Sequence, residues 1–229
     1  MKIGMILDAP FPPDPRVENE AVSLVNNGHE VFLFCLKYND EKASEIINGI
    51  QVKRYVSSKL EYKLSALAYT IPLYSFLMQK KISKFIEETK IEALHIHDIR
   101  IAEAVYNVNK KRNLPVVLDL HDNMPEVMKL YPHLQKFPGK YIISPQKWKQ
   151  KEEEFIRKAN KVIAVSPEFL ETLATRLPSE KEKLVLVPNT IRTSFFEDYT
   201  VDETILEKYK NNFVILYLGD THLRRGIQT

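Results

Sequence analysis

Short apolar runs alternate with longer amphipathic stretches along the chain. Most of the runs are almost continuously apolar and rich in Val, Ile and Leu, which is typical of parallel strands covered on both faces. They lie at residues 2–7, 30–36, 51–56, 92–97, 115–120, 161–165, 183–188 and 213–219. The run at 51–56 alternates between apolar and polar residues, which also fits an edge strand. Repeated strand–helix–strand units predict a doubly wound, mostly parallel α/β sheet of the Rossmann-like kind, with right-handed crossovers.

Capping residues indicate where the helices between these strands begin and end. Asp14 followed by Pro15 predicts an N-cap and a first helical residue, and Gly28 stands where a glycine would end that helix. Ser166 followed by Pro167 predicts the start of a second helix in the same way.

Composition and charge narrow the class of protein. The chain has 229 residues, of which 44% are hydrophobic, so it can build a core for one large domain or one and a half. A net charge of +3 is too small to favour nucleic acid as a partner. The single cysteine, Cys35, lies in an apolar run and predicts a buried thiol. Because no uncharged run reaches the length of a spanning helix and residues 1–7 are too short for a secretory signal, we expect a cytoplasmic protein.

Polar residues follow several of the predicted strands. In an open parallel sheet, ligands bind in the crevice beyond the carboxyl ends of the strands, so these residues predict one site at that edge. They are Asp8, His97, Asp98, His121, Asp122, Ser166 and Asn189.

The proline-rich segment from Pro10 to Pro15 joins the first predicted strand to the first helix. Proline fixes φ near the value that a helix start needs. A stiff loop would hold the positive end of the helix toward the crevice, where a phosphate or a hydroxyl-rich ligand binds well. A plain rigid turn explains the prolines equally well.

Two histidines, His95 and His97, alternate along one predicted strand, so both rings point to the same face. Such a pair could bind a metal ion, but the sequence shows no third ligand at a convincing spacing. We therefore expect no metal, with His95 packed in the sheet and His97 and Asp98 at the crevice.

Six segments, in this order, resemble the N-terminal part of a GT-B glycosyltransferase of family 4. They are "FPPDPRVENEAVSLVNNGHEVFLF", "ALHIHD", "PVVLDLHDNMPE", "ANKVIAVSPEFLETL", "KLVLVPNTI" and "VILYLGDTHLRRGI". In that family the first domain binds the acceptor and the second binds the nucleotide-sugar donor. The resemblance implies an acceptor-binding domain over residues 1–195. It further implies a linker and the first strand and loop of a truncated donor domain over residues 196–229, so that the fragment is expected to be inactive alone.

The resemblance also implies roles for particular residues. His121, with Asp122 beside it, would reach the donor sugar near the scissile bond, although a histidine satisfied by a neighbouring carboxylate is the alternative. Acceptor-binding positions are Pro12, Pro13, Arg16, His97, Asp98 and Glu126. Donor-phosphate positions are Gly219, Arg224 and Arg225. No cofactor or metal is implied, because basic side chains and helix N-termini would meet the diphosphate charge. The sequence departs from the family at Asp220, where an arginine is usual, and at residues 14–21, where many members have paired glycines.

The expected function is therefore a retaining transfer of a sugar from a nucleotide-sugar donor to a glycan or glycolipid acceptor, as in cell-surface polysaccharide assembly. The alternatives are a non-catalytic module that binds a glycan or a protein, and a GT-B sugar-nucleotide epimerase. A dehydrogenase is excluded, because the first strand lacks the Gly-x-Gly-x-x-Gly turn that a dinucleotide needs.

Two further segments invite functional interpretation. Residues 59–90 are strongly hydrophobic and edged by lysines, so they could lie on an anionic membrane at its inner face, or pack against the sheet. Pro72 is expected to kink or split this helix. Residues 123–147 hold four prolines and little periodicity, which predicts a long loop that acts as a lid or recognises the acceptor.

Overall fold

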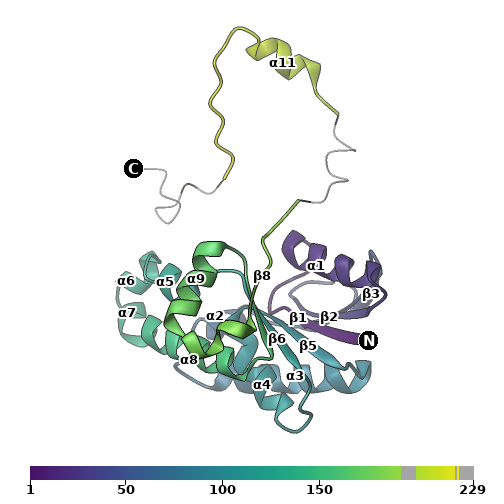
Figure 1. Ribbon diagram of the computed structural model, residues 1–229, viewed down its shortest axis with the longest axis vertical. Coiled ribbons are helices and arrows are strands. Elements are labelled where there is room, and N and C mark those ends of the chain that lie inside the picture. The colour runs from purple at the N-terminus through teal and green to yellow at the C-terminus, as the bar shows by residue number, and fades with distance from the viewer. Residues whose placement is uncertain (192–199, 220, 222–229) are drawn as a thin grey trace. The chain divides into compact units, whose positions relative to one another are not determined.

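The computed structural model describes residues 1–191, 200–219 and 221, and the chain divides into two compact units, residues 1–189 and 190–229 (Figure 1). The strands are β1 (Lys2–Ile6), β2 (Glu30–Lys37), β3 (Ser44–Ile47), β4 (Ile50–Val56), β5 (Ala93–His97), β6 (Val116–Leu120), β7 (Lys161–Ala164) and β8 (Leu184–Leu186). The helices of the first unit are α1 (Pro15–Asn26), α2 (Lys59–Ser65), α3 (Leu73–Thr89), η1 (Ile99–Ile101), α4 (Ala102–Asn109), α5 (Met124–Met128), α6 (Pro132–Gln135), α7 (Gly139–Ile142), α8 (Pro145–Lys158), α9 (Pro167–Arg176) and η2 (Pro178–Lys183). The second unit contains α11 (Glu203–Tyr209).

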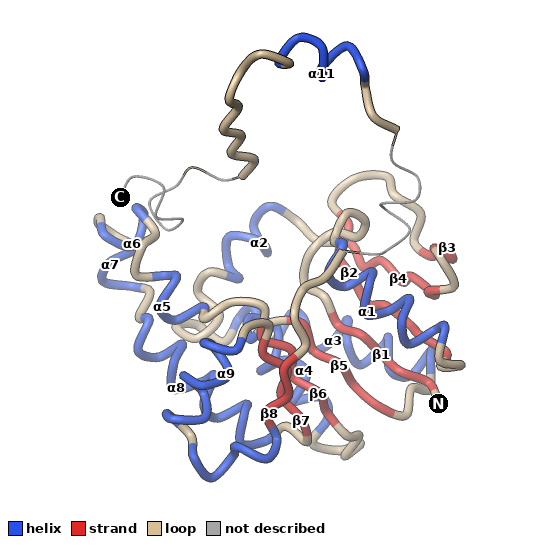
Figure 2. The backbone as a smooth tube through the Cα atoms, turned by 45° about the horizontal axis from the view of Figure 1, so that its top comes forward, coloured by secondary structure: helices blue, strands red, loops and turns tan. Residues whose placement is uncertain are grey.

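The eight strands found in the described residues form one sheet in the order β3-β4-β2-β1-β5-β6-β7-β8 (Figure 2). All neighbours run parallel except β3 and β4, which are antiparallel. The chain starts at the centre, with β1 between β2 and β5, and the strand order reverses there. The predicted doubly wound, mostly parallel α/β sheet is confirmed.

Helices cover both faces of this sheet, so each central strand buries both sets of its side chains. Along β2, Val31, Leu33 and Cys35 join the core under α1, whereas Phe32 and Phe34 join the larger core formed with α3, α4 and α8. Successive side chains of a strand point to opposite faces, so a strand buried on both faces must be apolar at nearly every position. This burial explains the continuous apolar runs.

The predicted caps are confirmed. A carboxylate oxygen of Asp14 accepts hydrogen bonds from the backbone N–H groups of Arg16 and Val17, at 3.2 and 3.4 Å, and Pro15 opens α1. Gly28 follows the end of this helix with a φ of 80°, a conformation that glycine adopts without a steric penalty. Ser166 caps α9 by accepting from the N–H of Phe169 at 3.1 Å.

Three expectations about secondary structure need correction. Residues 213–219 were expected to form a strand, but the described part of this segment is not a strand, and Phe213 is 94% exposed. A strand exists only when a neighbour completes its hydrogen bonds, and no described strand runs beside this segment.

Strand β3 was missed, although the turn at Asn48 and Gly49, with φ values of 48° and 82°, is a typical hairpin turn for an Asn-Gly pair.

The third correction concerns residues 123–147, which are not a plain long loop. They hold α5, α6, α7 and the start of α8. Pro125, Pro132 and Pro145 lie in the first turn of a helix, where the missing N–H of proline costs nothing. Pro72, in contrast, separates α2 from α3 as predicted.

None of the helices within the described residues combines the length and the apolar character that crossing a membrane requires.

Candidate functional site

The carboxyl ends of β1, β5 and β6 bring together residues that are far apart in the sequence. Nδ1 of His97, at the end of β5, lies 3.1 Å from Nε2 of His121, directly after β6. Between the two strands, the backbone N–H of Asp98 donates to the carbonyl oxygen of Asp119 at 2.9 Å. These contacts place the two predicted His-Asp pairs beside each other, as the sheet topology predicts.

Asp119, which lies inside β6, is the residue that joins the histidines. Its Oδ2 atom is 3.0 Å from Nδ1 of His97 and 2.9 Å from Nε2 of His121, and all three side chains are buried. Burial would raise the pKa of Asp119, but the histidine hydrogen bonds outweigh burial and lower it. Burial lowers the pKa of His97 to about 4. Burial would also lower the pKa of His121, but the hydrogen bond to Asp119 outweighs it and raises that pKa.

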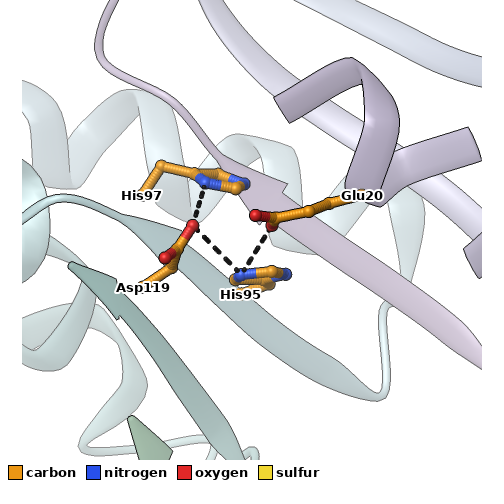
Figure 3. Close-up of side chains that lie close together, drawn as sticks. All are labelled: Glu20, His95, His97 and Asp119. Carbon is orange, nitrogen blue, oxygen red and sulfur yellow. Dashed lines mark hydrogen bonds and ion pairs between the residues drawn. The ribbon is translucent and has the colours of Figure 1, made fainter. Parts of the chain in front are cut away.

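Two more ionisable side chains, Glu20 and His95, complete this buried cluster, and Figure 3 shows them with His97 and Asp119. Nε2 of His95 lies 3.4 Å from Oε2 of Glu20 on α1 and 3.8 Å from Oδ2 of Asp119. Burial raises the pKa of Glu20 to about 7, and the nearby charge of Asp119 acts in the same direction. Glu20, His95, His97 and Asp119 are the group in the described residues that could hold a metal ion.

The start of α1 forms the more exposed side of the site. Arg16 donates from Nη2 to the carboxylate of Asp14 at 3.0 Å, and its side chain is 36% exposed. Burial would lower the pKa of Arg16, but Asp14 outweighs burial and raises it, and the charges of Asp98 and Asp122 add to this effect. The start of α1 therefore lies beside the two aspartates that follow β5 and β6.

Asp98 has an unusual backbone for a residue with a side chain. Its φ of 65° and ψ of 159° belong to a region that only glycine adopts freely. Burial raises the pKa of its carboxyl to about 6. Strained backbone of this kind is concentrated at ligand sites, and here it lies at the carboxyl end of a central strand. Whereas burial affects the carboxyl of Asp98, the side chain of Asp122 is exposed.

The proline loop is hydrogen-bonded to strand β4 of the sheet. Arg54, on β4, donates from Nε and Nη2 to the carbonyl oxygen of Phe11, and both groups are buried. Pro12 and Pro13 follow this anchor and are exposed. The loop is therefore anchored to β4 at Phe11, while Pro12 and Pro13 face solvent.

A cavity of about 300 Å³ opens at the same end of the sheet. Arg100 contributes to its wall and binds Asp8 through two nitrogens, with Nη2 2.8 Å from Oδ1. The hydroxyl of Tyr74 also donates to Asp8, at 2.7 Å. The residues that line the cavity are Asp8, Ala9, Pro10, Tyr38, Lys59, Tyr62 and Arg100.

Several residues of this site were not foreseen from the sequence. Asp119 lies inside the apolar run "VVLDL". A single aspartate in a run that is otherwise apolar could have indicated a buried polar group. Glu20 lies on the predicted first helix, where the sequence around it does not mark it as part of a site. Arg100 follows the predicted Asp98 by two positions but was not singled out.

The structure does not bring every predicted site residue into this cluster. Glu126 is exposed on α5 and pairs with Lys129 at 2.7 Å. His97 does lie in the cluster, but its side chain is fully buried, so its ring faces other protein groups. Gly219 belongs to the second unit, and Arg224 and Arg225 lie outside the described residues. Their roles stay predictions.

Comparisons with known proteins identify a family. The model described as "Glycosyltransferase Family 4" matches residues 16–195. No curated protein sequence matches the chain significantly.

Similar solved structures include sucrose-phosphate synthase from Thermosynechococcus elongatus, at 13% identity and a TM-score of 0.65, covering 91% of this chain and 52% of that one. Others are Os79 from O. sativa in complex with UDP (10%, TM-score 0.59, 91% and 57%) and a UDP-glucosyltransferase from Polygonum tinctorium (12%, TM-score 0.56, 92% and 56%). At these identities the likeness shows the fold, which is that of a GT-B Rossmann-like domain. The chain spans about half the length of these proteins.

Proposed function

Because the chain belongs to glycosyltransferase family 4, we propose that the protein transfers a sugar from a nucleotide-sugar donor to a glycan or glycolipid acceptor, with retention of configuration. In this proposal residues 1–195 form the domain that binds the acceptor. The observation that carries the proposal is the meeting of Arg16, Asp98, His121 and Asp122 at one edge of the sheet. An edge of this kind is where open α/β sheets bind their ligands.

Each of these side chains suits a different part of the donor. Asp98 and Asp122 are carboxylates that can accept hydrogen bonds from sugar hydroxyls. Arg16, at the positive end of α1, suits a phosphate oxygen. Nδ1 of His121 has no hydrogen-bond partner within the described residues and is available to the sugar, although neighbouring side chains must shift to uncover it.

The acceptor would occupy the 300 Å³ cavity. The rings of Tyr38 and Tyr62 offer flat surfaces and hydroxyl groups to a sugar, and Lys59 brings a positive charge to the wall. Arg100 is already paired with Asp8, so it would shape the cavity more than neutralise a ligand. This arrangement suits an acceptor that combines a sugar with a phosphate.

The departing diphosphate would be met by basic groups and backbone N–H groups, without a metal ion at the reacting atoms. Gly219, Arg224 and Arg225 remain the proposed phosphate-binding residues of the donor side.

Contact with a membrane surface would bring the enzyme to a lipid-linked acceptor. The chain between residues 60 and 76 exposes several large apolar side chains, and Lys59 and Lys63 lie beside them. They are Leu60, Tyr62, Ile71, Leu73 and Phe76. Basic residues around exposed apolar ones favour binding to anionic lipid. We include this peripheral contact, at the inner face of the cell membrane, in the proposal.

The test is nucleotide release from a panel of nucleotide sugars, measured on the full-length protein with and without a lipid extract of its own cells. We expect release with at least one donor, and kcat/KM lower by about 10-fold or more in Asp122→Asn, a loss typical of removing one binding group. Asp40→Asn, in an exposed loop, is the matched control and should be unchanged.

Absence of release with every donor would refute the transfer. Glycan binding without release would instead indicate a binding module. The configuration of the new linkage in the product, read by NMR, tests retention separately.

A further inference from the structure

We propose that Glu20, His95, His97 and Asp119 form a binding site for one divalent transition-metal ion, with Zn²⁺ as the ion that fits the ligands best. Nothing in the proposed sugar transfer requires this ion. It would be a structural ion beneath the ligand-binding edge, and its existence can be tested without measuring activity.

Three elements deliver the four ligands to one point. His95 and His97 alternate on β5 and therefore face the same side, with their ring centroids 4.5 Å apart. Asp119 is the residue of β6 that pairs in register with His97, so its side chain lies on that side too. Glu20 comes from α1, the helix that covers this face of the sheet (Figure 3). The sequence alone showed two possible ligands, His95 and His97. The neighbouring strand β6 supplies Asp119 as the third ligand, and α1 supplies Glu20 as the fourth.

The closest ligand atoms have the spacing that metal coordination requires. One potential ligand atom from each residue lies within 4.8 Å of all the others. The closest pairs are Nδ1 of His97 and Oδ2 of Asp119 at 3.0 Å, and Nε2 of His95 and Oε2 of Glu20 at 3.4 Å. Tetrahedral zinc with bonds of about 2.0–2.1 Å holds its ligand atoms about 3.3 Å apart. The wider pairs, such as Nε2 of His95 and Oδ2 of Asp119 at 3.8 Å, would have to move closer together for all four atoms to bind one ion.

Buried atoms without hydrogen-bond partners point to a missing contact. Oε2 of Glu20, Nε2 of His95 and Oδ1 of Asp119 are all buried and make no hydrogen bond of good geometry among the described residues; the first two atoms face each other as an ion pair at 3.4 Å. Buried polar atoms in proteins are nearly always satisfied, so a group of them around one point is unusual. A divalent ion would supply a partner to Glu20 and His95 at once. It would also balance the two carboxylate charges, which are costly to bury uncompensated.

The ligand types select the ion. Imidazole nitrogens favour zinc and other first-row transition metals, whereas Mg²⁺ and Ca²⁺ prefer a shell of oxygen atoms. His121 would act on the site from outside, because its Nε2 lies 2.9 Å from the Asp119 oxygen and ligating carboxylates are usually hydrogen-bonded in turn. The side chain of Glu20 is 17% exposed, so it offers a path of entry.

The experiment uses the full-length protein, stripped with a chelator and then titrated with Zn²⁺ alone. We expect uptake of about one ion per chain by elemental analysis and calorimetry. The temperature of unfolding should rise with Zn²⁺ concentration, because an ion that binds only the folded state stabilises it. Co²⁺ in its place should give the visible absorption of a four-coordinate nitrogen and oxygen site.

Two variants and two matched controls locate the site. Glu20→Gln and His95→Gln should bind Zn²⁺ at least about 10-fold more weakly, because loss of even an outer-shell partner typically costs that much and each variant removes a ligand itself. Glu18→Gln, on the same helix, and His29→Gln, outside the cluster, should bind as the unaltered protein does. Circular dichroism checks that the variants fold. If they do not fold, the cobalt spectrum of the unaltered protein still tests the site, because it needs no variant. Absence of binding to the stripped protein, or binding that survives both ligand variants, would overturn the proposal.

Discussion

Arg54 donates from Nε and Nη2 to the carbonyl oxygen of Phe11, at 3.0 and 2.8 Å, and so ties β4 to the proline loop. Its third nitrogen donates to the carbonyl of Lys42 at 3.0 Å, and Glu45 pairs with the guanidinium. The Arg54 side chain is 3% exposed. One buried cation therefore satisfies two loop carbonyls and fixes the segment that leads into α1.

We expect Arg54→Met to lower the free energy of unfolding by about 3 kcal/mol, since it leaves buried acceptors without donors and Glu45 without its partner. Arg112→Met is the matched control, because Arg112 pairs with Glu87 nearer the surface and should cost less than about 1 kcal/mol. Urea unfolding measures both. Equal losses in the two variants would contradict the anchoring role.

Asp14 should make stability depend on pH. Burial would raise its pKa, but the hydrogen bond and charge of Arg16 outweigh burial and lower it from 3.8. A lowered pKa means that the folded state holds this proton less tightly than the unfolded state. The contribution of Asp14 to stability is therefore complete above about pH 4 and is lost as the pH falls through the folded pKa.

Asp14→Asn keeps an oxygen to cap α1 but removes the charge. The stability difference between the unaltered protein and Asp14→Asn should shrink as the pH is lowered from 6 to about 2.5. Asp14→Ala also loses the cap and should cost about 1 kcal/mol more than Asp14→Asn. If the stability difference between the unaltered protein and Asp14→Asn stays constant over this pH range, the pH-dependent contribution of Asp14 is refuted.

The Asp8–Arg100 pair should show strong energetic coupling. Arg100→Met leaves Asp8 buried, with Tyr74 as its remaining side-chain donor among the described residues, so a loss of about 3 kcal/mol is expected. Adding Asp8→Asn should recover part of this loss, which gives a coupling energy of about 2 kcal/mol in the double-mutant cycle. The exposed pair of Glu126 and Lys129 serves as the control cycle and should give less than about 0.5 kcal/mol. Similar coupling in both cycles would show that burial does not strengthen the first pair.

Phe76 should contribute to membrane binding, since it is 70% exposed at the start of α3. Phe76→Ser should reduce co-sedimentation with anionic vesicles several-fold at low salt, because it removes apolar surface that the lipid would cover. Ile46→Ser is the control, since Ile46 is equally exposed (74%) but lies on β3. Binding unaffected by Phe76→Ser, or lost equally in both variants, would count against this surface.

The fold class and the family could be predicted from the sequence because each rests on local signals. Continuous apolar runs, the Asp14 and Ser166 caps and the glycine after α1 act over a few residues, and the structure confirms all of them except the run at residues 213–219. The errors arose where local signals had two meanings. Proline at 125, 132 and 145 was interpreted as a breaker but starts helices. Residues 213–219 have the composition of a strand, but composition alone does not provide a neighbouring strand.

The site could be predicted only in part. Sheet topology placed His97, Asp98, His121 and Asp122 at one edge, and their actual neighbours confirm that placement, while their chemical roles remain predictions. The contacts of Glu20 with His95, and of Asp119 with both later histidines, join residues from different elements. Such contacts depend on the packing of α1 on the sheet, which no local pattern specifies.

The burial of Cys35 has a practical consequence for following motion in solution. This thiol is the only one in the chain, it is 0% exposed, and burial raises its pKa to about 12. Maleimide dyes react with exposed thiolates, so they should leave it untouched while the protein is folded. A cysteine introduced at an exposed position such as Phe76 can then carry a single fluorophore without any change to the native sequence elsewhere.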